Sequence, residues 1–267
     1  MTILQPALSD LENMARQAGA ILRAGYGKRH DITHKGAIDL VTDTDHLSED
    51  LLVSTIQTKF PGHHIVTEEA GILAGDLEHC WYIDPLDGTV NFAHDVPLFC
   101  VTLAYAFRGE MQLGVIYEPM RDECYTAERG KGAWMNGEAI HVSTTPDLLH
   151  SLLVTGFPYD MWSTSLNNLK YFTHFSLCSQ GVRRLGSAAL DLAYIAAGRL
   201  DGFWEITLRP WDIAAGGLLV REAGGVVTRM DGSPDILQSP ISILAGNPVI
   251  HPLMLPIFQN DHLLIKY

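Results

Sequence analysis

The pattern of the chain changes near residue 150, and this change limits the folds that it can adopt. Within residues 99–128, apolar runs flank a turn at 108–110, which predicts antiparallel strands joined as a hairpin. After Ser151, short apolar runs alternate with helix-like stretches, a pattern typical of an α/β unit. We therefore predict an N-terminal α+β half, residues 1–145, that packs as one compact body with a C-terminal α/β half, residues 146–267.

Single elements can be predicted inside both halves. Apolar residues at helical spacing predict one helix over residues 8–22 and a second from about Thr44, with Leu47, Leu52 and Ile56 on one face. Short apolar runs predict strands that end near Glu68 and Asp84, whereas the neighbouring His63–His64 pair is expected in solvent. In the C-terminal half we expect strands 152–154, 182–185, 203–206 and 226–228 and helices 163–178, 187–197 and 212–223.

Composition narrows the class of function. The chain carries 18 Lys and Arg residues against 31 Asp and Glu residues, a formal net charge of −13, with no basic run. This balance disfavours a nucleic-acid or anionic-membrane surface as the main function. No stretch approaches the roughly 20 apolar residues that span a bilayer, so we expect a soluble, cytoplasmic protein. The four cysteines are far apart, which excludes a zinc ribbon or a disulfide framework and predicts reduced, buried thiols.

The segment 81–92 carries the most chemical information. An apolar stretch delivers Asp84 and Asp87, separated by Pro85, which biases the residue before it toward an extended conformation. The Gly-Thr pair that follows suits a turn opening a short helix, whose free amides favour an anion such as phosphate. The two carboxylates and the Leu86 carbonyl can face one point, and hard oxygen ligands of this kind favour Mg²⁺ or Mn²⁺ over zinc.

Other acidic positions can join this pair. Glu68 and Glu69 follow a predicted strand, and Asp212 opens an apolar helix rich in small residues. Taken alone, Asp212 is also explained as a helix cap, worth about 1 kcal/mol. Two competing hydrolase schemes fail on spacing: Pro85 occupies the position where a haloacid-dehalogenase-type phosphatase needs its nucleophilic Asp, and no P-loop or Gly-x-Ser-x-Gly pattern is present.

Together these segments resemble the inositol monophosphatase family of lithium-sensitive, Mg²⁺-dependent phosphatases, in its bacterial inositol-1-monophosphatase branch. The matching segments are 68–69, 84–89, 185–189, 203–205 and 211–216. The resemblance runs from Lys35 to Asn247, and Thr67 departs from the Gly that many members carry before the paired glutamates. It implies a layered α-β-α-β-α sandwich, usually a homodimer, with two or three Mg²⁺ ions in each site that Mn²⁺ can replace.

The resemblance also implies the metal ligands. Glu69, Asp84 and the Leu86 carbonyl would hold one ion, and Asp84, Asp87 and Asp212 a second. Glu69 would help to hold a weaker third ion and belongs to the catalytic set. Four carboxylates that meet in one cleft would repel one another strongly without cations, so the implied ions agree with the chemistry of the residues.

Catalytic and substrate-binding residues follow from the same resemblance. Thr89, hydrogen-bonded to Asp45, would orient the attacking water, and the Gly88 and Thr89 amides would bind phosphate. Arg183 and Arg184 alternate on a predicted strand, so one can face the cleft and aid an anion; we predict Arg183, and a structural ion pair or a dimer contact explains each arginine equally well. The substrate would contact Asp87, Gly186, Ser187, Ala188, Glu205 and Asp212.

The sequence therefore predicts a Mg²⁺-dependent phosphomonoesterase acting on inositol monophosphate, a small phosphorylated polyol. Fructose bisphosphate, histidinol phosphate and phosphoadenosine stay open as alternative substrates, because members of the superfamily share the metal ligands. Glu205 favours inositol because a carboxylate can accept hydrogen bonds from ring hydroxyls. A non-enzymatic regulatory role on the same fold is the alternative from another class, and the intact metal ligands and Thr89 argue against it.

Overall fold

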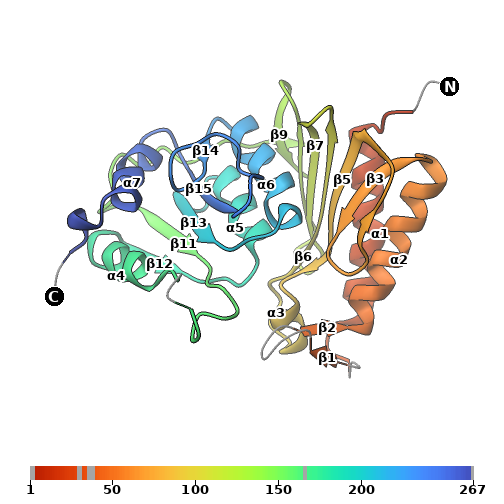
Figure 1. Ribbon diagram of the computed structural model, residues 1–267, viewed down its shortest axis with the longest axis horizontal. Coiled ribbons are helices and arrows are strands. Elements are labelled where there is room, and N and C mark those ends of the chain that lie inside the picture. Colours follow the sequence, from red (N-terminus) through yellow and green to blue (C-terminus); the bar gives the residue numbers. More distant parts are fainter. Residues whose placement is uncertain (1–3, 29–31, 35–39, 165–166, 266–267) are drawn as a thin grey trace.

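The computed structural model describes residues 4–28, 32–34, 40–164 and 167–265, so Lys35, where the resemblance begins, lies outside the described residues. The elements stack in five layers (Figure 1). Helices α1 (Leu8–Gly25) and α2 (Asp43–Lys59) cover one face of an eight-stranded sheet, and α5 (Ala188–Ala196) and α6 (Pro210–Glu222) separate it from a five-stranded sheet. Helices α4 (Leu169–Cys178) and α7 (Ile250–Gln259) cover the outer face. The predicted α-β-α-β-α sandwich is confirmed.

The eight-stranded sheet is formed before residue 140 and has the order β10-β9-β8-β7-β6-β5-β3-β4. Its strands are β3 (His63–Thr67), β4 (Gly71–Leu73), β5 (Asp76–Asp87), β6 (Cys100–Phe107), β7 (Glu110–Glu118), β8 (Glu123–Glu128), β9 (Gly132–Met135) and β10 (Glu138–Ala139). The predicted hairpin is confirmed, since β6 and β7 pair antiparallel on either side of residues 108–109. Only β3 and β5 run in parallel, and their shared end becomes important for the site.

The five-stranded sheet follows residue 151 and has the order β12-β11-β13-β15-β14. Its strands are β11 (Leu152–Thr155), β12 (Gly181–Arg183), β13 (Gly202–Ile206), β14 (Val226–Thr228) and β15 (Ser242–Gly246). The first three pair in parallel, and β15 pairs antiparallel with β13 and β14. The sequence prediction missed β15 and α7; Pro256 lies inside α7, and an internal proline hides a helical pattern. The helix predicted from residue 163 begins only at Leu169.

Short elements complete the chain. Strands β1 (Ile32–His34) and β2 (Leu40–Thr42) form a two-stranded sheet, and α3 (Thr89–Ala93) and η1 (Asp261–Leu263) are single turns. Among the helices of the described residues, none combines the length and the apolar character needed to cross a membrane.

The buried face of α2 differs from the prediction. Leu52 and Ile56 are fully buried, but Leu47 is 56% exposed. Toward its N-terminus the buried face is polar and carries Asp45, Ser48 and Glu49. A helix at the edge of a core normally buries apolar residues, so this polar stretch needs partners elsewhere in the fold.

The expectation that His63 is solvated is wrong. Side chains alternate along a strand, and His63 starts β3 on its buried side, 5% exposed. Its ring stacks on that of His79 with centroids 4.5 Å apart, and its Nδ1 accepts a hydrogen bond from Trp81 Nε1 at 2.9 Å. Burial lowers the pKa of His63 to about 4, so the ring is neutral at physiological pH.

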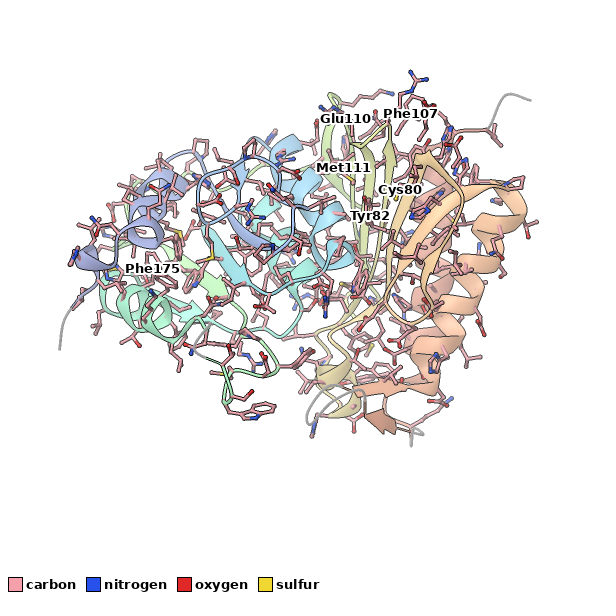
Figure 2. The ribbon with its side chains drawn as sticks, in the orientation of Figure 1. Cys80, Tyr82, Phe107, Glu110, Met111 and Phe175 are labelled. Carbon is pink, nitrogen blue, oxygen red and sulfur yellow. The ribbon has the colours of Figure 1, made fainter. Side chains whose placement is uncertain are left out.

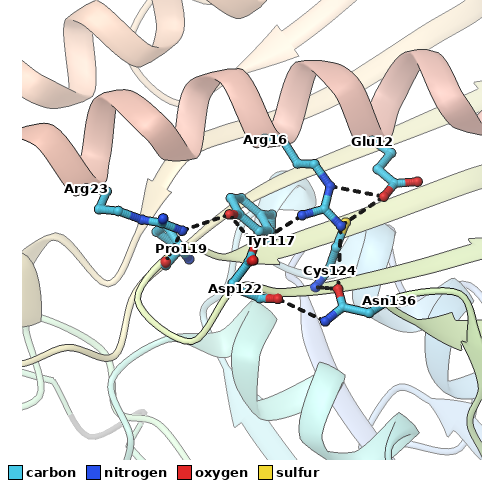
Figure 3. A network of polar contacts seen from close by, with 8 residues as sticks. All are labelled: Glu12, Arg16, Arg23, Tyr117, Pro119, Asp122, Cys124 and Asn136. Carbon is cyan, nitrogen blue, oxygen red and sulfur yellow. Dashed lines mark hydrogen bonds and ion pairs between the residues drawn. The ribbon is translucent and has the colours of Figure 1, made fainter.

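A polar network joins α1 to the turn between β7 and β8 (Figure 3). Arg16 donates to Asp122 Oδ1 at 3.2 Å, and Arg23 donates to the Pro119 carbonyl at 2.6 Å and to the Tyr117 hydroxyl at 3.0 Å. Exposed ion pairs contribute only about 0–1 kcal/mol each. The network therefore orients α1, while the apolar core beneath it provides most of the stability.

Small residues let α6 approach the eight-stranded sheet closely. A Cβ atom added to Gly114 on β7 would lie 3.0 Å from the Ala215 carbonyl oxygen, and one added to Gly216 would lie 2.5 Å from Leu192 Cβ. A larger side chain at Gly114 would displace α6 from the sheet, and one at Gly216 would displace it from α5. The close contact matters for function because Asp212 lies in the first turn of α6.

Candidate active site

Two parallel strands bring the first carboxylates together. β3 and β5 pair in register with Thr67 beside Ile83, so Glu68 and Asp84 come next to each other at the same end of the sheet. Alternation along β5 then decides their direction. Ile83 packs in the core beneath α1 and α2, whereas Tyr82 projects toward the C-terminal half (Figure 2). Asp84 has the parity of Tyr82 and faces the C-terminal half.

The same alternation distinguishes the paired glutamates. Thr67 is fully buried and donates its hydroxyl proton toward α2, so Glu68 points to the opposite side and lines the cavity that holds Asp84. The charge of Glu68 raises the pKa of Asp84, after the larger effect of burial, whereas the charge of Glu69 acts on Asp45. The structure thus places Glu68, not the predicted Glu69, among the cavity carboxylates.

A break in strand pairing turns Asp87 toward the same place. The register of β5 with β6 shifts between Asp84 and Asp87, and the Leu86 amide donates to Asp84 Oδ1 at 2.9 Å. Gly88 then adopts a φ of 96°, and a Cβ atom there would lie 2.9 Å from the Leu98 carbonyl oxygen. Because only glycine adopts this conformation without strain, the turn requires glycine at position 88.

Thr89 and Asp45 form the predicted hydrogen bond. Thr89 Oγ1 lies 3.2 Å from Asp45 Oδ1 and 3.0 Å from the Leu86 carbonyl oxygen, so one proton serves two acceptors. Asp45 Oδ2 in turn accepts from the Thr42 amide at 2.8 Å. The Thr89 hydroxyl is therefore held from two sides, and its oxygen keeps a free lone pair.

The C-terminal half forms the opposite wall. Ser187 Oγ and the Ala189 amide each donate to Asp87 Oδ2 at 2.7 Å, which joins the start of α5 to the end of β5. Asp212 Oδ2 accepts from the Arg209 amide at 2.7 Å. Arg209 is the N-cap residue of α6, and Asp212 is the third helical residue, whose carboxylate bonds back to the N-cap amide as in a capping box. Asp212 therefore stabilises the start of α6 and also lines the cavity.

Glu205 lies on β13 with its carboxylate against Gly156, where any Cβ atom would overlap it. Burial, followed by the charge of Asp87, raises the pKa of Glu205 to about 8, and Arg184 acts in the opposite direction. Glycine at position 156 therefore makes room for a buried acid beside the cavity.

These side chains line one cavity of about 920 Å³ between the two halves. Arg184 lines it, whereas the predicted Arg183 is exposed on β12 and does not. Asp45 lies behind Thr89 and outside the cavity wall. The predicted residues that the cavity does bring together are Asp84, Leu86, Asp87, Gly88, Thr89, Gly186, Ser187, Ala188, Glu205 and Asp212.

Besides Glu68 and the exposed Asp160, the predicted site lacked one buried carboxylate of the cavity. Asp191 on α5 is 1% exposed, and its Oδ1 has no hydrogen-bond partner within the part of the chain that the structure describes. Burial, then the charges of Glu205 and Asp87, raises its pKa well above the usual range. An acid among otherwise apolar residues of a buried helix is the sequence signal that identifies it.

The cavity carboxylates form a donor set that suits a hard cation. Burial and the charges of Glu68, Asp87 and Asp212 raise the pKa of Asp84 well above its usual range. Burial and Asp87 do the same to Asp212. A divalent cation would remove this repulsion, and oxygen-only donors favour Mg²⁺. Over residues 4–28, 32–34, 40–164 and 167–265 no three acidic, His or Cys side chains already surround one point, so the donors are present without a finished coordination sphere.

Comparison with known proteins identifies the family. Residues 4–263 match the model of the inositol monophosphatase family. The chain belongs to this family. It is 44% identical over 263 residues to "Nus factor SuhB" of Escherichia coli K12, covering 97% of both chains. It is 47% identical to "Inositol-1-monophosphatase" of Synechocystis over 88% of this chain and 82% of that protein.

Solved structures agree with this assignment. The inositol monophosphatase from Anabaena superposes with a TM-score of 0.85 at 43% identity over 94% of each chain. The extragenic suppressor protein suhB from Bartonella henselae gives a TM-score of 0.89 at 38% identity over 96% of this chain and 99% of that one. Membership supports a phosphatase of a generally metal-dependent family. Several relatives are named Nus factor. The expectation from net charge that nucleic acid is an unlikely partner is therefore not supported.

Proposed function

We propose that this protein is a Mg²⁺-dependent phosphomonoesterase that hydrolyses inositol monophosphate to inositol and phosphate. The observation that carries the proposal is the group Asp84, Asp87 and Asp212, which line one cavity beside the Thr89–Asp45 hydrogen bond. Relatives named inositol-1-monophosphatase favour inositol monophosphate over other sugar and alcohol phosphates.

The cavity carboxylates would hold the ions. Glu68, Asp84 and the Leu86 carbonyl are the donors for one Mg²⁺, and Asp84, Asp87 and Asp212 for another; Mn²⁺ suits the same oxygen ligands. When bound, the ions supply an activated water and stabilise charge on the leaving oxygen.

Thr89 and Asp45 would orient the water that attacks the phosphorus atom. Thr89 donates its proton to Asp45 or to the Leu86 carbonyl, so its remaining lone pair can accept a hydrogen bond from the attacking water. Burial raises the pKa of Asp45, and two bonds from Thr42 keep this carboxylate fixed. The Gly88 and Thr89 amides would bind the phosphate oxygens.

The alcohol side of the substrate would meet the C-terminal half. Ser187 and Ala189 hold Asp87 in place, and Glu205 would accept hydrogen bonds from the ring hydroxyls. Arg184 lines the same cavity and can attract an anionic substrate. Glu205 and Arg184 take no part in cleavage of the P–O bond, so these two residues select the substrate and leave the chemistry unchanged.

A substrate panel with purified protein and Mg²⁺ tests this function. We expect the largest kcat/KM for inositol monophosphate, and the panel includes fructose bisphosphate, histidinol phosphate and phosphoadenosine. A larger kcat/KM for one of these three would transfer the assignment to that substrate. If Mg²⁺-dependent phosphate release is absent with inositol monophosphate and with all three alternatives, the proposed phosphatase activity is refuted.

Substitution of Glu205 tests the choice of inositol. A cation at Asp87 favours the ionised form of Glu205 in the Mg²⁺-loaded enzyme. A hydrogen bond to a charged group is worth about 1.5–3 kcal/mol, so Glu205→Ala should lower kcat/KM for inositol monophosphate by about 10- to 150-fold. It should leave kcat/KM for an aryl phosphate nearly unchanged, because that substrate has no hydroxyl to offer. Parallel losses on both substrates would show that Glu205 is structural.

A second candidate function is regulatory, and the relatives named Nus factor SuhB favour it. Such a role requires a partner surface but not the metal ligands. Affinity purification with wild type and with Asp84→Asn separates the two functions. A partner retained by the inactive variant would add a regulatory role that is independent of hydrolysis.

A further inference from the structure

The polar face of α2 contacts three separate segments of the candidate site. Asp45, Ser48 and Glu49 lie three and four positions apart, the spacing that places side chains on one helical face. All three are buried, and Glu49 is the most exposed at 5%. Each is bonded to a different segment of the candidate site: the start of α3, the end of β5, and the end of β3 with the turn that follows it.

Each of the three side chains has its own partners in the site. Asp45 accepts from Thr89, and Ser48 Oγ donates to the Pro85 carbonyl at 2.8 Å, between the two acids of β5. Glu49 Oε1 accepts three hydrogen bonds from the turn that carries Glu68. Its donors are Thr67 Oγ1 at 2.5 Å, the Ala70 amide at 3.1 Å and the Glu69 amide at 3.3 Å.

These bonds are more than helix packing requires. Burying a polar group costs free energy unless it is hydrogen-bonded, and apolar residues would attach α2 to the sheet equally well, as Leu52 and Ile56 do one and two turns later. Ser48 and Glu49 instead bond to backbone and side-chain groups of the site segments. Glu49 holds the residues on both sides of Glu68 while it leaves the Glu68 side chain to the cavity.

We propose that Glu49 is a positioning residue that presents Glu68 to the metal site, and that α2 sets the spacing of the three segments through Asp45, Ser48 and Glu49. The inference rests on the proposed function, because it assigns metal binding to Glu68. Partners that orient metal ligands typically change metal affinity about 10- to 100-fold when removed.

Mn²⁺ binding measured by titration calorimetry tests the proposal without relying on catalysis. Glu49→Ala removes the acceptor of three hydrogen bonds and should weaken Mn²⁺ binding at least about tenfold, with kcat at saturating Mg²⁺ within about threefold of wild type. Glu49→Gln keeps an acceptor oxygen at the same place and should restore binding to within about threefold. Ser54→Ala is the matched control, because Ser54 is exposed on the same helix and its hydroxyl donates to the Asp50 and Leu51 carbonyls of that helix.

Several results would overturn the positioning role of Glu49. Unchanged Mn²⁺ affinity in Glu49→Ala, or an equal loss in Glu49→Gln, overturns the proposal. So does a lower melting temperature of the metal-free protein without a change in affinity, which would mark Glu49 as merely structural. If Glu49→Ala does not fold, Thr67→Val removes one donor at nearly constant volume and should still weaken Mn²⁺ binding. Wild type that binds Mn²⁺ but hydrolyses no phosphomonoester would refute the proposed function alone.

Discussion

Glu205 makes the stability of the metal-free protein depend on pH. The acid is buried on β13 near Asp87, and its pKa is raised to about 8 from an ordinary value of 4.5. A raised pKa means that ionisation is harder in the folded than in the unfolded chain. The stability that Glu205 contributes is therefore complete below pH 4.5, is lost as the pH rises from 4.5 to 8, and stays constant above pH 8.

The size of the effect follows from the same shift. Each pKa unit corresponds to about 1.4 kcal/mol, so the change from 4.5 to about 8 sets an upper limit of about 5 kcal/mol. Glu205→Gln keeps the shape of the side chain and removes the ionisable group. Because the amide also needs hydrogen-bond partners, we expect a gain of about 1–3 kcal/mol over wild type at pH 8.5, and little gain at pH 4.5.

Urea unfolding of both proteins in EDTA, at several values between pH 4.5 and 9, measures this difference. The free energy of unfolding of Glu205→Gln should separate from that of wild type as the pH rises. Saturating Mg²⁺ should reduce the gap, because a cation at Asp87 removes part of the repulsion. Parallel curves across the whole range would refute the reasoning and indicate that Glu205 ionises normally.

Further outcomes can be measured on the same protein. Asp84→Asn should keep the fold but retain less than about a tenth of the activity in saturating Mg²⁺, because Asp84 would serve both ions. Thr89→Ala should lower kcat by roughly 10²-fold or more without loss of Mg²⁺ affinity in calorimetry. His63→Gln keeps an acceptor for the Trp81 indole but cannot be protonated; since the pKa of His63 is lowered from 6.5 to about 4, acid unfolding between these values should be less steep than in wild type. Asp201→Ala removes the acceptor of bonds from Ser143, Thr145 and Leu152 and should lower the free energy of unfolding by about 3 kcal/mol in urea.

Local patterns in the sequence identified most of the framework. The apolar run before Asp84, the Asp-Gly-Thr turn and the acid that opens α6 each reflect rules that act within a few residues: a strand ends, a glycine takes a positive φ, and a carboxylate caps a helix. For this reason the hairpin and the acidic group Asp84, Asp87 and Asp212 could be predicted from local patterns, whereas the order of the layers and the substrate-binding residues were implied by the resemblance to a known family.

Choices between neighbouring residues required the tertiary structure. Glu68 rather than Glu69, and Arg184 rather than Arg183, face the cavity. In the first pair, the parity of β3 and the bond from Thr67 to α2 decide which side chain turns inward. Two adjacent residues of the same type give the same sequence pattern whichever of them faces the cavity. The sequence alone therefore cannot distinguish between them.

Burial of polar groups was also decided only by the fold. Asp191 is one acid in an apolar helix, and Ser48 and Glu49 are polar residues at the start of α2. Their burial follows only once α5 lies between two sheets and α2 lies over the ends of β3 and β5. The sequence by itself determined which chemical groups are present and the approximate positions of most helices and strands. Only tertiary packing determined which of those groups share a cavity, because that depends on contacts between segments far apart in the chain.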